Sequence, residues 1–133
     1  MLVMDKVINL KLYLIAFKAR GHMPAGTANL LIEKGTDFIR EFTLKDKTNN
    51  TVINLTGSTI TFDIAAKQGN TSILSIPILV PTPLLGKFTA KLDQSLVDLI
   101  TITSGWFVIN ITWSNGDTER LVEGRVVISK GVL

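Results

Sequence analysis

From about residue 38 onward, apolar and polar side chains alternate with a period of two, and this pattern constrains the fold more than any other feature. Its clearest passage places four large apolar residues on one face of a strand: Phe107, Ile109, Ile111 and Trp113. Asn115-Gly116 then favours a tight hairpin turn with positive φ angles, and Leu121, Val126 and Ile128 continue the return strand. We therefore expect strands with one dry and one solvated face.

Shorter passages of the same kind, separated by turn-forming residues, cover residues 38–44, 58–64, 73–79 and 87–92. Pro77 has no backbone N–H to donate to a neighbouring strand, so we expect its segment at a sheet edge. Gly124 suggests a bulge or a switch between sheets. A short helix is expected within residues 93–105. There Ser95 and Asp98 resemble a capping box, and three apolar residues would cover one end of the core: Leu96, Leu99 and Ile100.

Seven or eight short strands, with turns about every ten residues, predict an all-β fold. We expect an antiparallel immunoglobulin-like β-sandwich with one short helix and an N-terminal arm. A chain of 133 residues fits a single domain with a sizeable core. The absence of cysteine excludes disulfides, thiolate metal sites and cysteine catalysis.

The net charge of +3 resides in residues 1–22, whereas the remainder of the chain has ten basic and ten acidic residues. A neutral body lacks the concentrated basic face that phosphate binding requires, so the sequence argues against nucleic acid as a partner.

Glycine and proline interrupt the pattern between residues 19 and 29, and we divide the chain there into an arm, residues 1–22, and a β-sandwich domain, residues 23–133. Five apolar residues of the arm would share one face of a helix: Val3, Val7, Leu10, Leu14 and Phe17. The even positions from Leu2 to Leu14 also alternate as in a strand, although the helix is preferred. Charges at Asp5, Lys6 and Lys11 argue against a membrane span and a secretory signal.

Residue types that carry chemistry are sparse. His22, the single histidine, stands at the boundary without evident partners, so a Ser-His mechanism is not expected. Four carboxylates are candidates for glycoside hydrolysis by position: Asp63, Asp117, Glu119 and Glu123. Each is more simply explained as part of a solvated strand face or hairpin. We expect no catalytic, cofactor-binding or metal-binding residues and no enzymatic activity.

The two tryptophans are separated by seven positions, so in an uninterrupted strand they face opposite sides. With Phe107 in the core, Trp113 would be buried near the turn and Trp106 would point outward. An outward tryptophan stacks on a sugar, anchors a protein contact, or is covered by the arm or a loop.

From Leu30 onward the chain resembles a family of small bacteriophage virion proteins. The resemblance rests on five features: Lys34 to Thr36, the aromatic strand from Phe38 to Asp46, the Asn54 to Gly57 turn, Ser95 to Phe107, and the closing Leu121 to Ile128. It covers about four fifths of the chain and leaves residues 1–22 outside. It implies a β-sandwich module of tail, baseplate or fibre-attachment components, and it brings no catalytic residues.

We therefore expect a structural virion protein that acts as an assembly adaptor through protein-protein contacts. Its partners would be other phage proteins and copies of itself, and its contact residues would be Trp106 and the five apolar residues of the arm. It would be made in the host cytoplasm and reside in the phage particle, with no cofactor and no membrane span. The alternatives are a capsid cement or decoration protein and a host-glycan-binding module.

Overall fold

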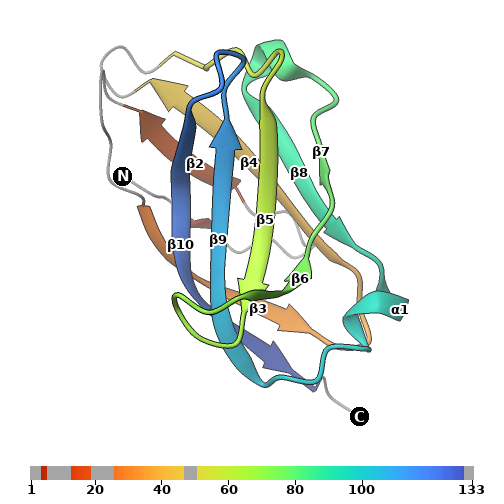
Figure 1. The fold of residues 1–133 in the computed structure, drawn as a ribbon. Coiled ribbons are helices and arrows are strands. Elements are labelled where there is room, and N and C mark those ends of the chain that lie inside the picture. The colour runs from red at the N-terminus through yellow and green to blue at the C-terminus, as the bar shows by residue number, and fades with distance from the viewer. Residues whose placement is uncertain (1–3, 6–12, 19–25, 47–50, 131–133) are drawn as a thin grey trace.

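The computed structural model describes residues 4–5, 13–18, 26–46 and 51–130, with side chains for residues 27–45 and 51–130. Within these residues the chain forms ten strands, one 3-10 turn and one short helix (Figure 1). In chain order they are β1 (Met4–Asp5), β2 (Tyr13–Lys18), β3 (Gly26–Glu33), β4 (Phe38–Asp46), β5 (Thr59–Ala65), β6 (Ser72–Ser75), β7 (Ile78–Leu79), η1 (Pro83–Leu85), β8 (Lys87–Leu92), α1 (Gln94–Val97), β9 (Ser104–Thr112) and β10 (Thr118–Ser129).

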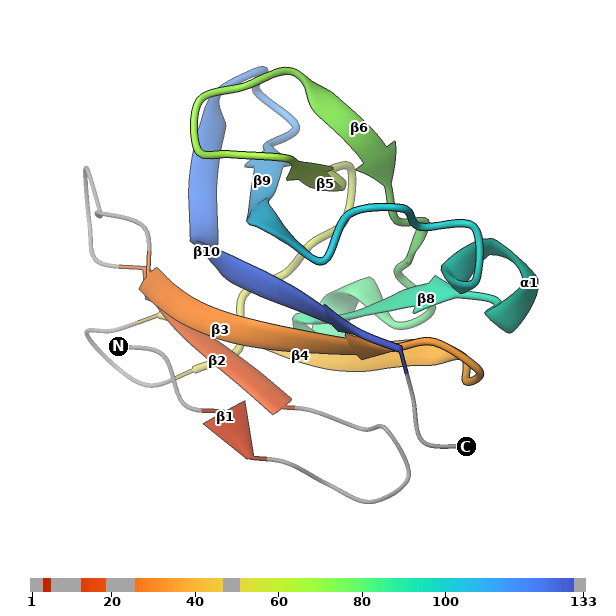
Figure 2. The ribbon, with the colours of Figure 1, turned by 90° about the horizontal axis from the view of Figure 1, so that it is seen from below.

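The strands form two five-stranded sheets, which confirms the predicted β-sandwich. The first sheet has the order β1-β2-β4-β8-β7, and the second has the order β3-β10-β9-β5-β6. Figure 2 shows the two layers from below. Eight of these strands, β3 to β10, belong to the predicted sandwich domain, in agreement with the expected seven or eight.

Alternating residues from both sheets meet between the layers and build the core. Phe62 of β5 is its centre: its ring lies 5.6 Å from that of Phe107, 6.1 Å from Phe38 and 6.4 Å from Phe42. Phe42 stacks on Phe88 at 4.9 Å. Offset and edge-to-face contacts of this kind add to the free energy gained by burying the rings.

Strand direction departs from a purely antiparallel sandwich in two places, because β3 pairs with β10, and β2 with β4, in parallel. The C-terminal half of β10 bends to run beside β3 (Figure 2).

The register shift in β10 lies between Arg120 and Val122 rather than at Gly124, so the predicted position of the bulge was wrong. Gly124 instead permits close approach of the β3 backbone, since an added Cβ would lie 2.7 Å from the Ala28 carbonyl carbon.

The N-terminal segment contains a strand where we preferred a helix. Tyr13–Lys18 forms β2, which pairs with Glu41–Asp46 of β4, and Met4–Asp5 pairs with the start of β2. Pairing to the edge of β4 satisfies backbone groups of both strands. It also follows the two-residue alternation that competed with the helical pattern in the sequence.

The segment that contains Pro77 lies at sheet edges, as predicted, but it is two strands rather than one. β6 ends the second sheet and β7 ends the first, so the chain crosses between layers at Ile76 and Pro77. Ile76 is buried, and its N–H donates to the Phe62 carbonyl at 2.8 Å, while Lys91 N–H donates to the Pro77 carbonyl at 3.1 Å. The crossing closes one side of the sandwich.

The short helix α1 is held by the loop between β3 and β4 rather than by the predicted capping box. The Asp37 carboxylate accepts the Gln94 N–H at 2.7 Å, and the Asp98 carboxylate accepts the Gly35 N–H at 2.8 Å. Val97 and Ile100 are buried beneath it. These two reciprocal hydrogen bonds fix α1 at one end of the sandwich.

The hairpin between β9 and β10 forms at the predicted position, but its loop has three residues, 114–116, because the Trp113 N–H donates to the Asp117 carbonyl at 2.7 Å. Gly116 has φ of 95° and donates its N–H to the Trp113 carbonyl at 2.9 Å. The Asn115 side chain accepts the Asp117 N–H at 2.9 Å. Asparagine thus closes the turn through its amide oxygen, and glycine supplies the left-handed conformation.

Arg40 lies half-buried on the core-facing side of β4. Its Nη1 donates to the Ile39 carbonyl at 2.8 Å and its Nη2 to the Leu31 carbonyl of β3 at 3.0 Å, while the guanidinium lies 4.6 Å from the Phe38 ring centre. Burial lowers the pKa of Arg40 from its usual value, and the charge of Glu33 opposes this shift. The side chain therefore links the two sheets where β3 faces β4.

Candidate protein interface

The four carboxylates considered for catalysis do not form a cluster in the structure. Asp63 accepts the Ser75 hydroxyl at 2.5 Å on the outer side of the β5–β6 pair. Asp117 belongs to the exposed hairpin turn, and Glu119 is half-buried in β10. In the part of the chain that the structure describes, no three His, Cys, Asp or Glu residues come together in a way that could hold a metal ion.

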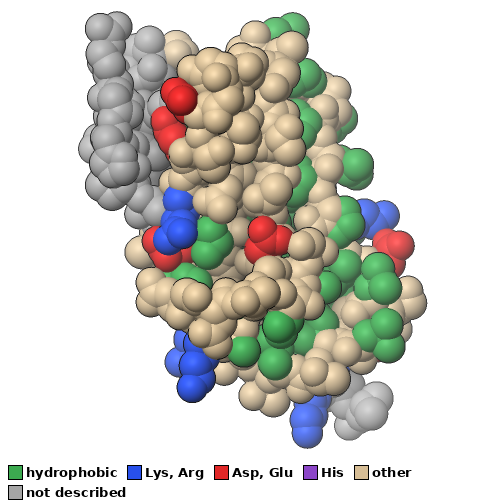
Figure 3. All heavy atoms as spheres, viewed as in Figure 1, with side chains coloured by type: hydrophobic (Ala, Val, Ile, Leu, Met, Phe, Trp, Pro, Cys, Tyr) green, Lys and Arg blue, Asp and Glu red, His purple; other side chains and the backbone are tan. Residues whose placement is uncertain are grey.

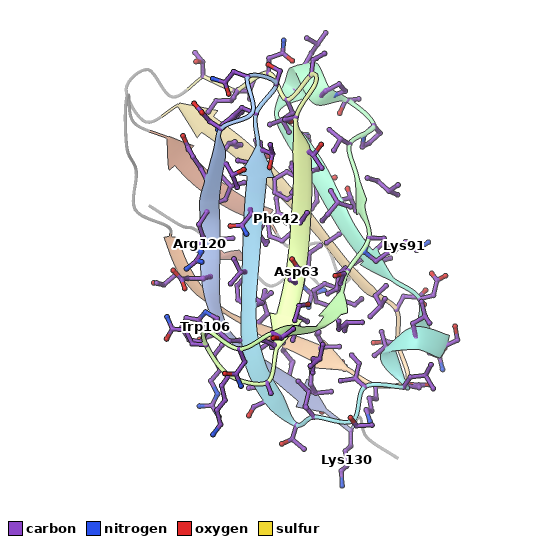
Figure 4. All side chains as sticks on the ribbon, viewed as in Figure 1. Phe42, Asp63, Lys91, Trp106, Arg120 and Lys130 are labelled. Carbon is purple, nitrogen blue, oxygen red and sulfur yellow. The ribbon has the colours of Figure 1, made fainter. Side chains whose placement is uncertain are left out.

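Trp106 lies on the outer side of β9, as the alternation predicts, and is half-buried there (Figure 4). Its indole N–H donates to Glu123 Oε1 at 3.1 Å, and Arg120 Nη1 lies 3.4 Å from the same carboxylate. The cross-strand neighbours of Trp106 are Ala65 and Arg125. One edge of the indole is therefore engaged in a polar network on the second sheet.

The predicted contact residues of the arm are only partly covered by the structure. Val3, Val7 and Leu10 lie outside the described residues, as does His22. Leu14 and Phe17 belong to β2, whose backbone pairs with β4. Their role in protein contacts stays a prediction.

A different surface stands out, on the side of the sandwich where β6 and β7 end the two sheets. Hydrophobic side chains gather there from η1, past β7 and β6, to α1 (Figure 3). Their exposed fractions run from 47% to 72%. We call this surface the apolar edge, and it consists of Ile73, Leu79, Leu84, Leu85, Leu96 and Leu99.

Two of these residues correct a prediction from the sequence. Leu96 and Leu99 were expected to cover the core together with Ile100. In the structure Val97 and Ile100 take that position, and Leu99 is 72% exposed. α1 begins at Gln94, whose N–H is capped by Asp37, and in this helix Val97 faces inward and Leu96 lies outside.

One end of the apolar edge is a rigid turn that presents two leucines to solvent. Leu84 and Leu85 belong to η1, which buries none of its residues. The turn is fixed by its backbone: Leu55 N–H donates to the Pro83 carbonyl and Leu44 N–H to the Gly86 carbonyl, both at 2.8 Å. Gly86 has φ of 68°, and an added Cβ would lie 2.7 Å from the Leu44 carbonyl oxygen. We call Leu84 and Leu85 the knob.

The other end of the apolar edge is hollow. A groove of about 550 Å³ lies between β6 and the segment that contains α1, and its lining includes Ile73, Leu96 and Leu99. Lining residues of the groove carry no charge, and their polar side chains are limited to serine and threonine. A lining with so few polar groups favours an apolar occupant.

The size of the apolar edge is that of a functional patch. With roughly 120 Å² for a fully exposed leucine side chain, its residues present about 400 Å² of apolar surface. The largest apolar patch on a typical monomer measures roughly 300–600 Å² and is often functional. A standard interface buries about 800 Å² on each partner, of which about 57% is apolar. The apolar edge therefore approaches the apolar area of one protein interface of ordinary size, roughly 460 Å² on each partner.

Comparisons with known proteins identify a similar fold but no family. No family model and no curated protein matches the chain. Among the described residues, no helix has the length and apolar character needed to cross a membrane. Among solved structures, the chain is similar to the N-terminal domain of phage TP901-1 ORF48, with 10% sequence identity and a TM-score of 0.50. The match covers 89% of this chain and 98% of that domain, so the two share the same fold over nearly their whole lengths.

Proposed function

We propose that the protein is a structural component of a bacteriophage virion and acts as an assembly adaptor in the tail, baseplate or fibre-attachment region. The observation that carries this proposal is the apolar edge, an exposed hydrophobic surface of about the size that a protein contact buries, on a β-sandwich. The similarity in fold to a domain of a phage protein supports the biological setting. The sequence resemblance to small virion proteins from Leu30 onward points in the same direction.

On this proposal the activity is binding rather than catalysis. Its partners are other phage structural proteins and further copies of the chain, and neither nucleic acid nor a cofactor takes part. Burial of the apolar edge would contribute about 10 kcal/mol at roughly 25 cal/mol per Å², against which stand the entropic costs of association. The free energy of binding that remains is enough for a stable contact only if the partner is complementary in shape.

Incorporation into particles tests the proposal. Phage that lacks the gene is complemented with the wild-type chain or with Leu99→Glu, and purified particles are examined for the protein. Leu99 is 72% exposed, so the substitution leaves the core intact but places a charge in the interface. We expect the wild-type chain in particles and little or none of the variant.

Val127→Glu is the matched control, because Val127 is also exposed, at 40%, but does not line the groove and lies on β10, which β9 and β5 separate from β6 in the second sheet. It should enter particles normally. Particles that assemble fully without the wild-type chain would contradict the proposed function. Equal incorporation of both variants would contradict the role of the apolar edge.

A further inference from the structure

The two ends of the apolar edge differ in shape, which suggests what fits against it. The knob projects at one end and the groove is hollow at the other, and both are apolar. β8 begins directly after η1 and ends directly before α1. Its six residues therefore separate the knob from the groove by about 20 Å. We propose that the apolar edge pairs with the apolar edge of a second copy of this chain, each knob seated in the groove of the other copy.

A two-fold axis produces this arrangement. In a two-fold dimer the same patch is used by both partners, so a knob that enters a groove is repeated by symmetry. β7 pairs with Ala90 and Thr89 in the middle of β8, and Leu79 is 57% exposed there. If the two-fold axis passes close to Leu79, the two copies of Leu79 contact each other. The knob of each copy then faces the groove of its partner.

The charges of the surface favour a second copy over a charged partner. Around a two-fold axis every central charge meets its own copy, so a patch with net charge repels itself. Neither the knob nor the groove lining contains a charged residue. Beside the groove, Lys91, which is labelled in Figure 4, lies 3.9 Å from the Asp93 carboxylate, so the pair has no net charge.

The backbone at the apolar edge is poorly suited to strand addition, so contact between copies through side chains is favoured. β6 has four residues, a register irregularity against β5, and Pro77 shortly after its end. Short edge strands, bulges and proline prevent another strand from adding to a sheet. The contact is therefore made by leucines on rigid supports: η1 is fixed by the backbone around Gly86, and α1 is fixed by Asp37 and Asp98.

This inference rests on the proposed assembly function and names one partner, so its test is separate from particle incorporation. The full chain is studied by sedimentation over a concentration series, as wild type, Leu84→Lys, Leu99→Glu and the control Val127→Lys. We expect a dimer for the wild type and the control. Each edge variant should dimerise about 1,000-fold more weakly, because every substitution spoils two symmetry-related contacts.

Mixing the two edge variants provides the decisive experiment. Chains with Leu84→Lys retain an intact groove, and chains with Leu99→Glu retain an intact knob. A mixed dimer therefore regains one native contact and pairs lysine with glutamate at the other. We expect the mixture to dimerise at least about 30-fold more tightly than either variant alone. Circular dichroism confirms that all chains are folded.

A monomeric wild type, a dimer that neither edge variant weakens, or a mixture that shows no rescue would each overturn the knob-and-groove pairing. The proposed function has its own readout. If Leu99→Glu is lost from particles while the wild-type chain is a monomer in solution, the apolar edge binds a different phage protein and only the pairing between copies is refuted.

Discussion

Replacement of Gly124 by alanine tests one of the two parallel pairings in the fold, that of β3 with β10. Gly124 lies between Ala28 on one side and Phe107 on the other. An added Cβ would lie 2.7 Å from the Ala28 carbonyl carbon and 3.0 Å from the Ala28 nitrogen, and closer still to the carbonyl oxygen. Because all these atoms belong to the backbone, no side chain can move to make room.

To restore ordinary contact, β3 must shift outward by about 1 Å or more, which stretches nearby N–H···O bonds from about 2.9 Å beyond the limit of a hydrogen bond. Loss of about two ladder bonds, with poorly satisfied backbone groups left behind, costs roughly 3–5 kcal/mol in the free energy of unfolding. For a domain of this size we expect the melting temperature to fall by about 10–20 °C.

The assay is urea denaturation followed by tryptophan fluorescence, supported by calorimetry. Gly116→Ala is the matched control, since Gly116 has φ of 95° but open space around it. Its cost should be limited to backbone strain, about 1–2 kcal/mol. If Gly124→Ala destabilises the protein no more than Gly116→Ala, the close approach of β3 to β10 is refuted.

Three further substitutions test the contacts that position the sheets and the groove. Arg40→Ala should lower the free energy of unfolding by about 2–3 kcal/mol in urea titrations, and Arg40→Lys should recover less than half, because an ammonium cannot reproduce the planar guanidinium that bonds the Leu31 carbonyl. Trp106→Phe removes the bond to Glu123 and should cost about 1 kcal/mol in the same assay; an unchanged stability would argue against this bond. Asp37→Ala removes the cap of α1, and we expect a loss of about 1 kcal/mol together with faster amide exchange at the start of the helix.

Much of the fold follows from the spacing of apolar residues along the chain. The alternation in β5, β8 and β9 places Phe62, Phe88 and Phe107 in the core, because a strand directs every second side chain to the same face. The hairpin at Gly116 is likewise local, since it depends on a backbone conformation that glycine adopts without strain. Such features need no knowledge of distant residues.

Features that depend on distant residues were predicted poorly. Leu96, Val97, Leu99 and Ile100 have much the same apolar character in the sequence, and the placement of α1 against the loop between β3 and β4 decides which of them face the core. The same holds for the segment around Pro77. Proline indicates an edge, but the division into β6 and β7 depends on which sheet each half meets.

By itself, then, the sequence determined a two-layer β-sandwich with its core phenylalanines, because side-chain alternation is a property of neighbouring residues. Tertiary structure alone decided that β3 and β10 run parallel, and that six apolar residues remain exposed along one side. Burial is a competition among all apolar residues for one limited interior, and the residues left outside are identified only when the sheets are assembled.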